Sequence, residues 1–311
     1  MKHFKILFSS IFLLLLLQSK AQLTFPHLAV LYDSAWTYKN LQLIPIRFTD
    51  SLYYDPTFPK SFMLLNNAIK SKKVQIKENN FEGRSNVNVL NLLNTSKEHI
   101  LVESGDLLKG GKQDRMFAET RLIPPDKEVD FLSVYCIEKG RWDKKAKPFT
   151  YGGFAGADIR KSGDSMGGQQ HVWKEIEKEF ATEKVTSETF PYLQVKQKKT
   201  ILPDYIAYFK NRFAQSDSLY AGFIVVSDSS IIGCDVFANE KLLIASFDNL
   251  INSYVEGVKK SEKSVADAKQ LVKVFANKLL GSEVSQKKFL EQHGKMFMYK
   301  NKPLHITAYG N

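Results

Sequence analysis

The chain has 311 residues, of which 43% are hydrophobic and 25% are charged, with a formal net charge of +11. A chain of this length forms one large or two small globular domains. The composition excludes a disordered acidic tail, a collagen-like fibre and a multi-span membrane protein, because each of these needs a far more biased composition. Two cysteines exclude a disulfide-dense scaffold and a zinc cluster of four thiolates.

Residues 1–21 are typical of a secretory signal peptide. Lysines precede the apolar run Ile6–Leu17, and Ser19 and Ala21 supply small residues at the two positions that determine cleavage. The run is shorter than the ~20 residues that span a bilayer, and no cysteine follows it to carry a lipid. We therefore expect a secreted or periplasmic protein of residues 22–311, without a stable membrane anchor, that carries 41 basic and 33 acidic side chains.

The lysines are spread along the chain in short groups and do not alternate with aromatic residues. A nucleic-acid platform needs such an alternation or a concentrated basic patch. We therefore expect no nucleic-acid partner, and solubility explains the scattered lysines.

Residues 22–142 have the short apolar and alternating runs of antiparallel strands. The predicted strands are Leu41–Phe48, Val74–Glu78, Val87–Leu93, His99–Glu103, Arg115–Ile123 and Val129–Ile137. A short helical turn is expected over Asn66–Lys73. Pro124–Lys127 forms a turn, because paired prolines cannot donate to a strand ladder.

Residues 143–168 are rich in glycine and predict a long connection without secondary structure, either a lid or a flexible linker. Residues 169–311 contain helical periodicity and hairpins. The predicted helices are Gln170–Ala181, Asp204–Phe213, a helix capped by Asn239, and a helix that begins at a capping box of Ser264 and Asp267 and ends at Leu280, where Gly281 closes it. The predicted hairpins are Ala221–Ser227 with Ile231–Phe237 and, at the end, Met296–Lys300 with Leu304–Tyr309.

This order of elements predicts an α+β fold. We expect a single α+β domain over residues 22–311, with an antiparallel β-rich half at 22–142, the glycine-rich loop at 143–168 and a half with helices and a β-hairpin at 169–311.

Charged residues are most concentrated in the segment Glu103–Arg115, and a second group, Glu138–Trp142, follows another predicted strand. Consecutive N–H groups at a glycine pair can point into one concavity, and Lys109, Lys112, Arg115 and Arg141 could hold a phosphate or carboxylate there. The carboxylates that could transfer protons are Glu103, Asp106, Asp114 and Glu138.

This segment is not a P-loop, because that motif needs lysine at 111 and serine or threonine at 112, where Gly111 and Lys112 stand. The alternative interpretation is structural. Acidic and basic side chains at strand ends, such as Glu138 and Arg115, can pair with each other and line the rim of a sheet.

Other chemistries have little support in the sequence. The histidines lack metal-ligand spacing, so we expect no metal site, and the serines lack the G-x-S-x-G elbow of serine hydrolases. Cys136 and Cys234 either form one disulfide or remain buried thiols. Trp142 could stack on a base or sugar, or lie in the core.

Three blocks resemble the ARPP-type domain, named for its association with ADP-ribosylglycohydrolase and rhodanese-phosphatase-superfamily proteins. They are Glu103–Arg115 with its GGKQDR motif, Leu122–Pro125, and Val134–Trp142 with its EKGRW motif, and the hairpin and helix after Gly222 are also similar. The resemblance covers most of residues 40–260. It implies a link to proteins that handle NAD-derived or ADP-ribosylated substrates. It also implies a site of Glu103, Gly110, Gly111, Lys112, Gln113, Asp114, Arg115, Glu138, Gly140, Arg141 and Trp142.

Two functions follow from these observations. The first is an exported ligand-handling domain whose site binds an anionic, ADP-ribose-like or phosphorylated ligand. Any catalysis would then fall to Glu103, Asp114 and Glu138, and no cofactor is expected. The second is a non-enzymatic extracellular binding or structural module whose charged segment is an ion-pair network. The first requires the charged residues to line one pocket, and the second requires them to be dispersed or buried against each other.

Overall fold

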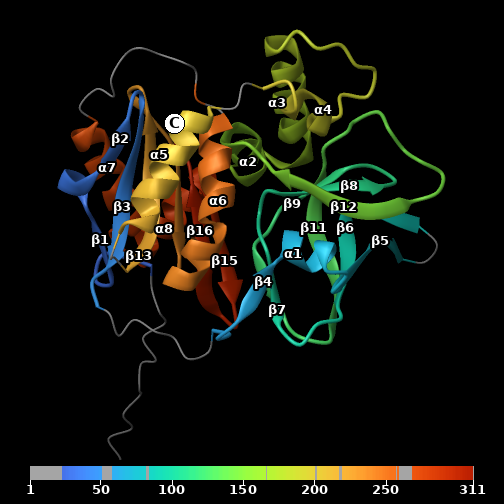
Figure 1. Ribbon diagram of the computed structural model, residues 1–311, viewed down its shortest axis with the longest axis horizontal. Coiled ribbons are helices and arrows are strands. Elements are labelled where there is room, and N and C mark those ends of the chain that lie inside the picture. The colour runs from blue at the N-terminus through green and yellow to red at the C-terminus, as the bar shows by residue number, and fades with distance from the viewer. Residues whose placement is uncertain are drawn as a thin grey trace, which may run out of the picture.

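The structure is a computed structural model that describes residues 23–50, 58–81, 84–165, 167–199, 202–216, 219–256, 258 and 268–310. The predicted signal peptide and the predicted capping box of Ser264 and Asp267 lie outside the described residues. Two lobes lie side by side (Figure 1). The sheet lobe comprises residues 23–50 and 202–310, and the inserted lobe comprises residues 58–199.

An antiparallel seven-stranded sheet forms the centre of the sheet lobe, in the order β1-β3-β13-β14-β16-β15, with β2 also paired to β3. Its strands are β1 (Leu28–Val30), β2 (Trp36–Tyr38), β3 (Leu41–Phe48), β13 (Tyr220–Ser227), β14 (Ser230–Phe237), β15 (Gly294–Tyr299) and β16 (Lys302–Ala308). Every residue of β13 is buried, as expected for a strand in the middle of a covered sheet.

Helices pack around this sheet and supply much of the core. They are the 3-10 helix η1 (Tyr32–Ser34), α5 (Pro203–Ala214), α6 (Glu240–Glu256), α7 (Lys269–Leu280) and α8 (Glu283–His293). Helix α6 contacts β13 and β14 through an apolar stripe that includes Phe247, Leu250 and Tyr254. Asn239 Oδ1 accepts a hydrogen bond from the Lys241 N–H at 2.8 Å, which confirms the predicted cap.

The inserted lobe contains a six-stranded sheet in the order β12-β8-β9-β11-β6-β5 and a three-stranded sheet in the order β10-β7-β4. The strands are β4 (Phe62–Leu64), β5 (Val74–Phe81), β6 (Arg84–Asn94), β7 (His99–Val102), β8 (Asp106–Gly111), β9 (Arg115–Phe117), β10 (Arg121–Ile123), β11 (Lys127–Cys136) and β12 (Lys147–Phe154). The helices are α1 (Leu65–Lys70), α2 (Ala157–Asp164), α3 (Gly168–Thr182) and α4 (Tyr192–Lys196).

Three apolar cores hold these layers together. The largest fills the sheet lobe and continues into the inserted lobe through Leu101, Leu122 and Phe154. The second lies within the inserted lobe around Leu92 and Phe117. The third lies between the six-stranded sheet and helices α2 to α4. The two lobes therefore share apolar packing as well as polar contacts.

The α+β fold with a β-rich N-terminal half is confirmed. The predicted strand Arg115–Ile123 is wrong in one respect, because it is two strands, β9 and β10. Strand β9 pairs with β11 in one sheet, and β10 pairs with β7 in another, so the chain changes sheets between them.

The expected loop at residues 143–168 is also wrong, because it contains β12 and α2. The glycines that suggested a loop serve packing and a bulge within β12. Gly153 has φ of +106°, which favours glycine, and the register with β8 shifts next to it. A Cβ on Gly156 would lie 2.7 Å from Glu256, so glycine permits close approach there.

Helix α8 was not predicted, although Ser282 and Ser285 form a reciprocal capping box at its start. Cys136 on β11 and Cys234 on β14 are buried free thiols, so the alternative of a disulfide is wrong. Among the described residues, no helix combines the length and apolar character needed to cross a bilayer.

Candidate functional site

A cavity of about 460 Å³ opens on the inserted lobe where β8, β12 and the residues around α4 meet. Four residues predicted for the site line it, namely Gly110, Asp114, Glu138 and Arg141. The other lining residues are Lys109, Lys147, Pro148, Thr150, Pro191, Leu193, Gln194 and Gln197. Its volume lies within the range of small-ligand pockets.

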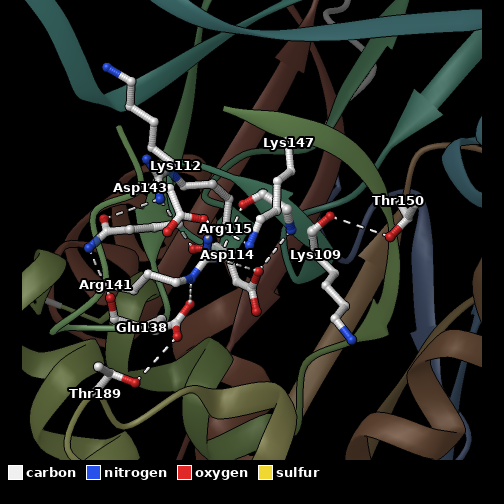
Figure 2. Close-up of polar contacts among 12 residues, drawn as sticks. Lys109, Lys112, Asp114, Arg115, Glu138, Arg141, Asp143, Lys147, Thr150 and Thr189 are labelled. Carbon is white, nitrogen blue, oxygen red and sulfur yellow. Dashed lines mark hydrogen bonds and ion pairs between the residues drawn. The ribbon is translucent and has the colours of Figure 1, made fainter. Parts of the chain in front are cut away.

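Arg141 is the centre of the charged cluster (Figure 2). Its Nε donates to Glu138 Oε2 at 2.5 Å, and its Nη1 donates to Asp143 Oδ2 at 2.7 Å. Its Nη2 donates to Asp114 Oδ1 at 2.9 Å and to the Gly110 carbonyl oxygen at 3.3 Å. One guanidinium thus joins the end of β11, the β8–β9 turn and the segment before β12.

Burial and hydrogen bonds shift the pKa values of Asp114 and Arg141. Burial raises the pKa of Asp114, and the hydrogen bond from the Gly110 N–H opposes that rise. Burial lowers the pKa of Arg141, but the hydrogen bond and charge of Glu138 outweigh it, so that its pKa is raised overall. The guanidinium therefore stays charged, and burial makes the Asp114 carboxylate easier to protonate than it is in water.

The glycine pair is required by the local backbone. Gly110 has φ of +122° and Gly111 has φ of +54°, both in the region that favours glycine. A Cβ on Gly110 would lie 2.4 Å from the Pro148 carbonyl oxygen, and one on Gly111 would lie 2.3 Å from the Phe149 ring. These glycines let β8 approach β12 closely enough to form one wall of the pocket.

The backbone N–H groups of this turn already have carboxylate acceptors. The Gly110 N–H donates to Asp114 Oδ1 at 2.8 Å, and the Lys112 N–H donates to Glu78 Oε1 at 2.6 Å. The expected concavity of N–H groups for an external anion is therefore occupied by the protein's own side chains.

Arg115 and Gln113 support the pocket from behind and do not line it. The Arg115 side chain is fully buried, and its Nη1 donates to Gln113 Oε1 at 3.2 Å and to the Asp114 carbonyl oxygen at 3.3 Å. Gln113 Nε2 donates to the Glu138 carbonyl oxygen at 3.0 Å. The expected pair of Arg115 with Glu138 is wrong, because Arg115 Nη2 lies 3.5 Å from Glu78 and Arg141 binds Glu138.

Lys112 and Trp142 lie beside the cluster without lining the cavity. The Lys112 Nζ lies 4.9 Å from the centre of the Trp142 ring, a cation–π distance. Trp142 is 45% exposed, so it is not a core residue. Gly140 is also outside the cavity, and a Cβ there would lie 2.9 Å from the Thr189 backbone.

Glu103 lies away from this pocket, at the interface between the lobes. Its Oε2 accepts a hydrogen bond from Asn249 Nδ2 of α6 at 2.9 Å. Of the four carboxylates predicted to transfer protons, the structure therefore brings together Asp114 and Glu138 at the pocket and places Glu103 and Asp106 together elsewhere.

Several residues of the site have no signal in the sequence. Lys147, Gln194 and Gln197 belong to segments that reach the pocket only through tertiary packing. Glu78 ends the predicted strand Val74–Glu78 and meets the charged segment in space. The only hint of this contact in the sequence is that Glu78 is an acidic residue at a strand end. In the described part of the chain, no three His, Cys, Asp or Glu side chains are grouped as a metal site needs.

Comparison with known proteins gives one match. The family model of the ARG and Rhodanese-Phosphatase-superfamily-associated Protein domain matches residues 29–308. No curated protein and no solved structure matches the chain.

Proposed function

Since the chain belongs to the family of the ARG and Rhodanese-Phosphatase-superfamily-associated Protein domain, we propose that it is a ligand-handling domain whose pocket takes a small anionic ligand. The ligand is phosphorylated or ADP-ribose-like in chemistry. The observation that carries this proposal is the cavity of about 460 Å³ in which charged residues from four chain segments meet.

The charges in and around the pocket balance, so an anion would be bound by the lysines at the rim and not by a net positive charge. Three carboxylates, from Asp114, Glu138 and Asp143, are bound by the guanidinium of Arg141, and Lys147 lies 3.1 Å from Asp143. These five groups leave a single net negative charge, which the ammonium of Lys109 balances.

Two ammonium groups at the rim are accessible to a ligand. Lys147 retains 67% of its side-chain exposure, and Lys109 is exposed and makes no ion pair with a described residue. The Lys109 amino group extends away from the carboxylate cluster (Figure 2). A phosphate at the rim would form charge-assisted hydrogen bonds with these ammonium groups, with the amides of Gln194 and Gln197 as further donors.

The proposal is one of binding, and we assign no reaction to Asp114 and Glu138. Both carboxylates bind Arg141 and so hold its guanidinium in the pocket wall. The first role of a carboxylate with such contacts is to position the guanidinium.

The test is a titration of the folded protein with ADP-ribose, AMP, ribose 5-phosphate, inorganic phosphate and ribose, followed by thermal shift and calorimetry. A ligand that binds the folded state raises its apparent stability. Lys109→Ala and Lys147→Ala are each expected to weaken binding of the best phosphate ligand about tenfold, or about 1.4 kcal/mol. Lys145→Ala is the matched control, because Lys145 is exposed two residues from Lys147 and does not line the cavity. Absence of binding by every anion, or an equal loss in the Lys145 variant, contradicts the proposal.

A second candidate function is a non-enzymatic binding or structural module whose charged segment is an ion-pair network. The observation that favours it is the binding of one guanidinium by three carboxylates. In that case Arg141→Met lowers stability while no anion in the panel shifts the melting temperature of the parent.

We also propose that the protein is exported, to the periplasm or to the medium. The support is the charged, apolar and small-residue pattern of residues 1–21. N-terminal sequencing of the protein recovered from each cell fraction tests this. A mature N-terminus at Gln22 in an extracytoplasmic fraction is expected, and an intact Met1 on cytoplasmic protein contradicts it.

A further inference from the structure

Two fully buried carboxyl groups, of Glu103 and Asp106, lie where the inserted lobe meets helix α6 of the sheet lobe. Glu103 is 1% exposed and Asp106 is 2% exposed. Glu103 and Asp106 stand at the two ends of the turn between β7 and β8. We call Glu103, Asp106 and their hydrogen-bond partners Tyr151 and Asn249 the interlobe cluster.

The hydrogen bonds of the interlobe cluster come from neutral donors. Glu103 Oε2 accepts from Asn249 Nδ2 at 2.9 Å. Asp106 Oδ1 accepts from the Tyr151 hydroxyl at 2.8 Å, and Asp106 Oδ2 accepts from the Glu103 N–H at 2.8 Å. Among the described residues, neither carboxyl forms an ion pair with a cation.

Ser246 of α6 lies beside the Glu103 carboxyl group. Glu103 Oε1 and Ser246 Oγ are both buried, and neither makes a hydrogen bond of normal geometry with a described residue. The Ser246 hydroxyl nevertheless favours the ionised Glu103 and opposes the rise of its pKa. Because a serine hydroxyl can donate to a carboxylate or accept from a carboxyl O–H, this contact is compatible with either state, and what disfavours the charge is burial without a cation.

The neighbouring basic groups do not pair with Glu103. Arg160 of α2 binds Asp235 at 2.6 and 3.2 Å, and His305 of β16 lies 2.8 Å from Asp235, so both contact another carboxylate first. Burial raises the pKa of Glu103, and the contact with Ser246, the hydrogen bond from Asn249 and the charge of Arg160 oppose this rise without cancelling it. Asp106 is a like charge on the same turn, and burial followed by the charge of Glu103 raises the pKa of Asp106 well above its ordinary value.

We infer that Glu103 is protonated when the β7–β8 turn is docked on α6, and that its ionisation releases the turn from the helix. An ionised Glu103 would be a buried carboxylate without a cation and next to a second carboxyl group, which is a costly arrangement. The docked state is therefore favoured at low pH and is lost as the pH rises through the range where Glu103 ionises. This makes the interlobe contact a pH-sensitive element of the fold, separate from the pocket.

The experiment is hydrogen exchange with mass spectrometry on the full folded chain from pH 5 to pH 9. The peptides of interest cover the turn 103–106 and the α6 residues 246–253. After correction for base-catalysed chemical exchange, protection in the parent is expected to fall about tenfold per pH unit above the midpoint, because one proton is released. Protection that stays constant over this range overturns the inference.

Two variants make the result specific. Glu103→Gln keeps an acceptor for Asn249 and a donor for Ser246, and it removes both the ionisable proton of Glu103 and the charge that raises the pKa of Asp106. Its corrected protection is therefore expected to fall less steeply with pH than that of the parent. Ser246→Ala removes a hydroxyl that favours the ionised Glu103, so the midpoint is expected to move to higher pH, and this variant tests the inference even where the Gln variant does not fold. Glu119→Gln is the control, because Glu119 pairs with Arg121 in the same lobe and should keep the parent profile. A parent slope in Glu103→Gln, or an unmoved midpoint in Ser246→Ala, overturns the inference.

Discussion

Replacing Arg141 by methionine should destabilise the protein and should do so more strongly at high pH. Methionine keeps much of the apolar stem of arginine but removes the guanidinium. Asp114 and Glu138 then remain at 8% side-chain exposure without their cation. Breaking a buried pair costs about 3–5 kcal/mol. The 20% exposure of Arg141 brings solvent screening, so we expect a loss of roughly 2–3 kcal/mol at pH 7.

The sign of the pH dependence follows from the lost cation. Burial already raises the pKa of Asp114, and loss of the Arg141 charge, which lowers it, raises that pKa further. The cost is therefore present at high pH and shrinks as the pH falls and Asp114 takes up a proton.

Urea unfolding at pH 5 and pH 8 measures both quantities, with the change in stability taken from the midpoint at an unchanged slope. The control is Arg121→Met, since Arg121 pairs with Glu119 at 2.9 Å but is 43% exposed, and its loss should stay below about 1 kcal/mol. A loss in Arg141→Met that equals the control, or that is the same at both pH values, refutes the assignment of Arg141 as the centre of the cluster.

Three other predictions follow from single positions. Gly110→Ala should lower the free energy of unfolding by at least about 2 kcal/mol in the same assay, because its Cβ would meet a carbonyl oxygen of β12. Gly168 also has positive φ but lies in open space, so Gly168→Ala should lose only about 1 kcal/mol. Equal losses in the two variants would contradict this. Burial raises the pKa of Glu179 to about 7 from its ordinary 4.5. The stability that the Glu179 proton provides is therefore lost as the pH rises from about 4.5 to about 7. Glu179→Gln should remove that part of the dependence of stability on pH. Cys136 and Cys234 are buried, and burial raises the pKa of both thiols, so an alkylating reagent should label both only after unfolding; labelling of one or none in the unfolded, unreduced chain would indicate a disulfide.

The sequence predicted those elements in which a short apolar run is bounded by turn residues. Leu41–Phe48 was predicted with the bounds that β3 has, and the hairpin of β13 and β14 was predicted because turn residues separate two apolar runs. The segment at 143–168 failed because glycine is equally compatible with a loop and with a close approach between strands. Composition cannot separate these two uses without the neighbouring chain.

The candidate site was predicted in part for a similar reason. Asp114 and Glu138 come together because β9 pairs with β11 over three residues, Cys136 facing Arg115. Adjacent strands carry their end residues to the same edge, which a sequence pattern can suggest. Lys147 reaches the pocket from β12, which packs on the first and second cores through Phe154 and Phe149. Gln194 reaches it from α4, which packs on the third core. The sequence grouped Glu103 with the pocket residues because its neighbours in the chain are polar, whereas in space it lies against helix α6 and away from the pocket.

The inserted lobe has a consequence for biogenesis. Strand β3 and its partner β13 are separated in sequence by the whole of that lobe, although Phe48 and Leu219 share a backbone hydrogen bond of 2.9 Å. As the chain emerges from the ribosome or a translocation channel, β3 therefore has only β1 and β2 to pair with until the complete inserted lobe has followed it. The inserted lobe is thus the first that can finish folding. The sheet whose strands precede and follow it in the sequence stays open at the apolar edge of β3 until β13 and the later strands arrive.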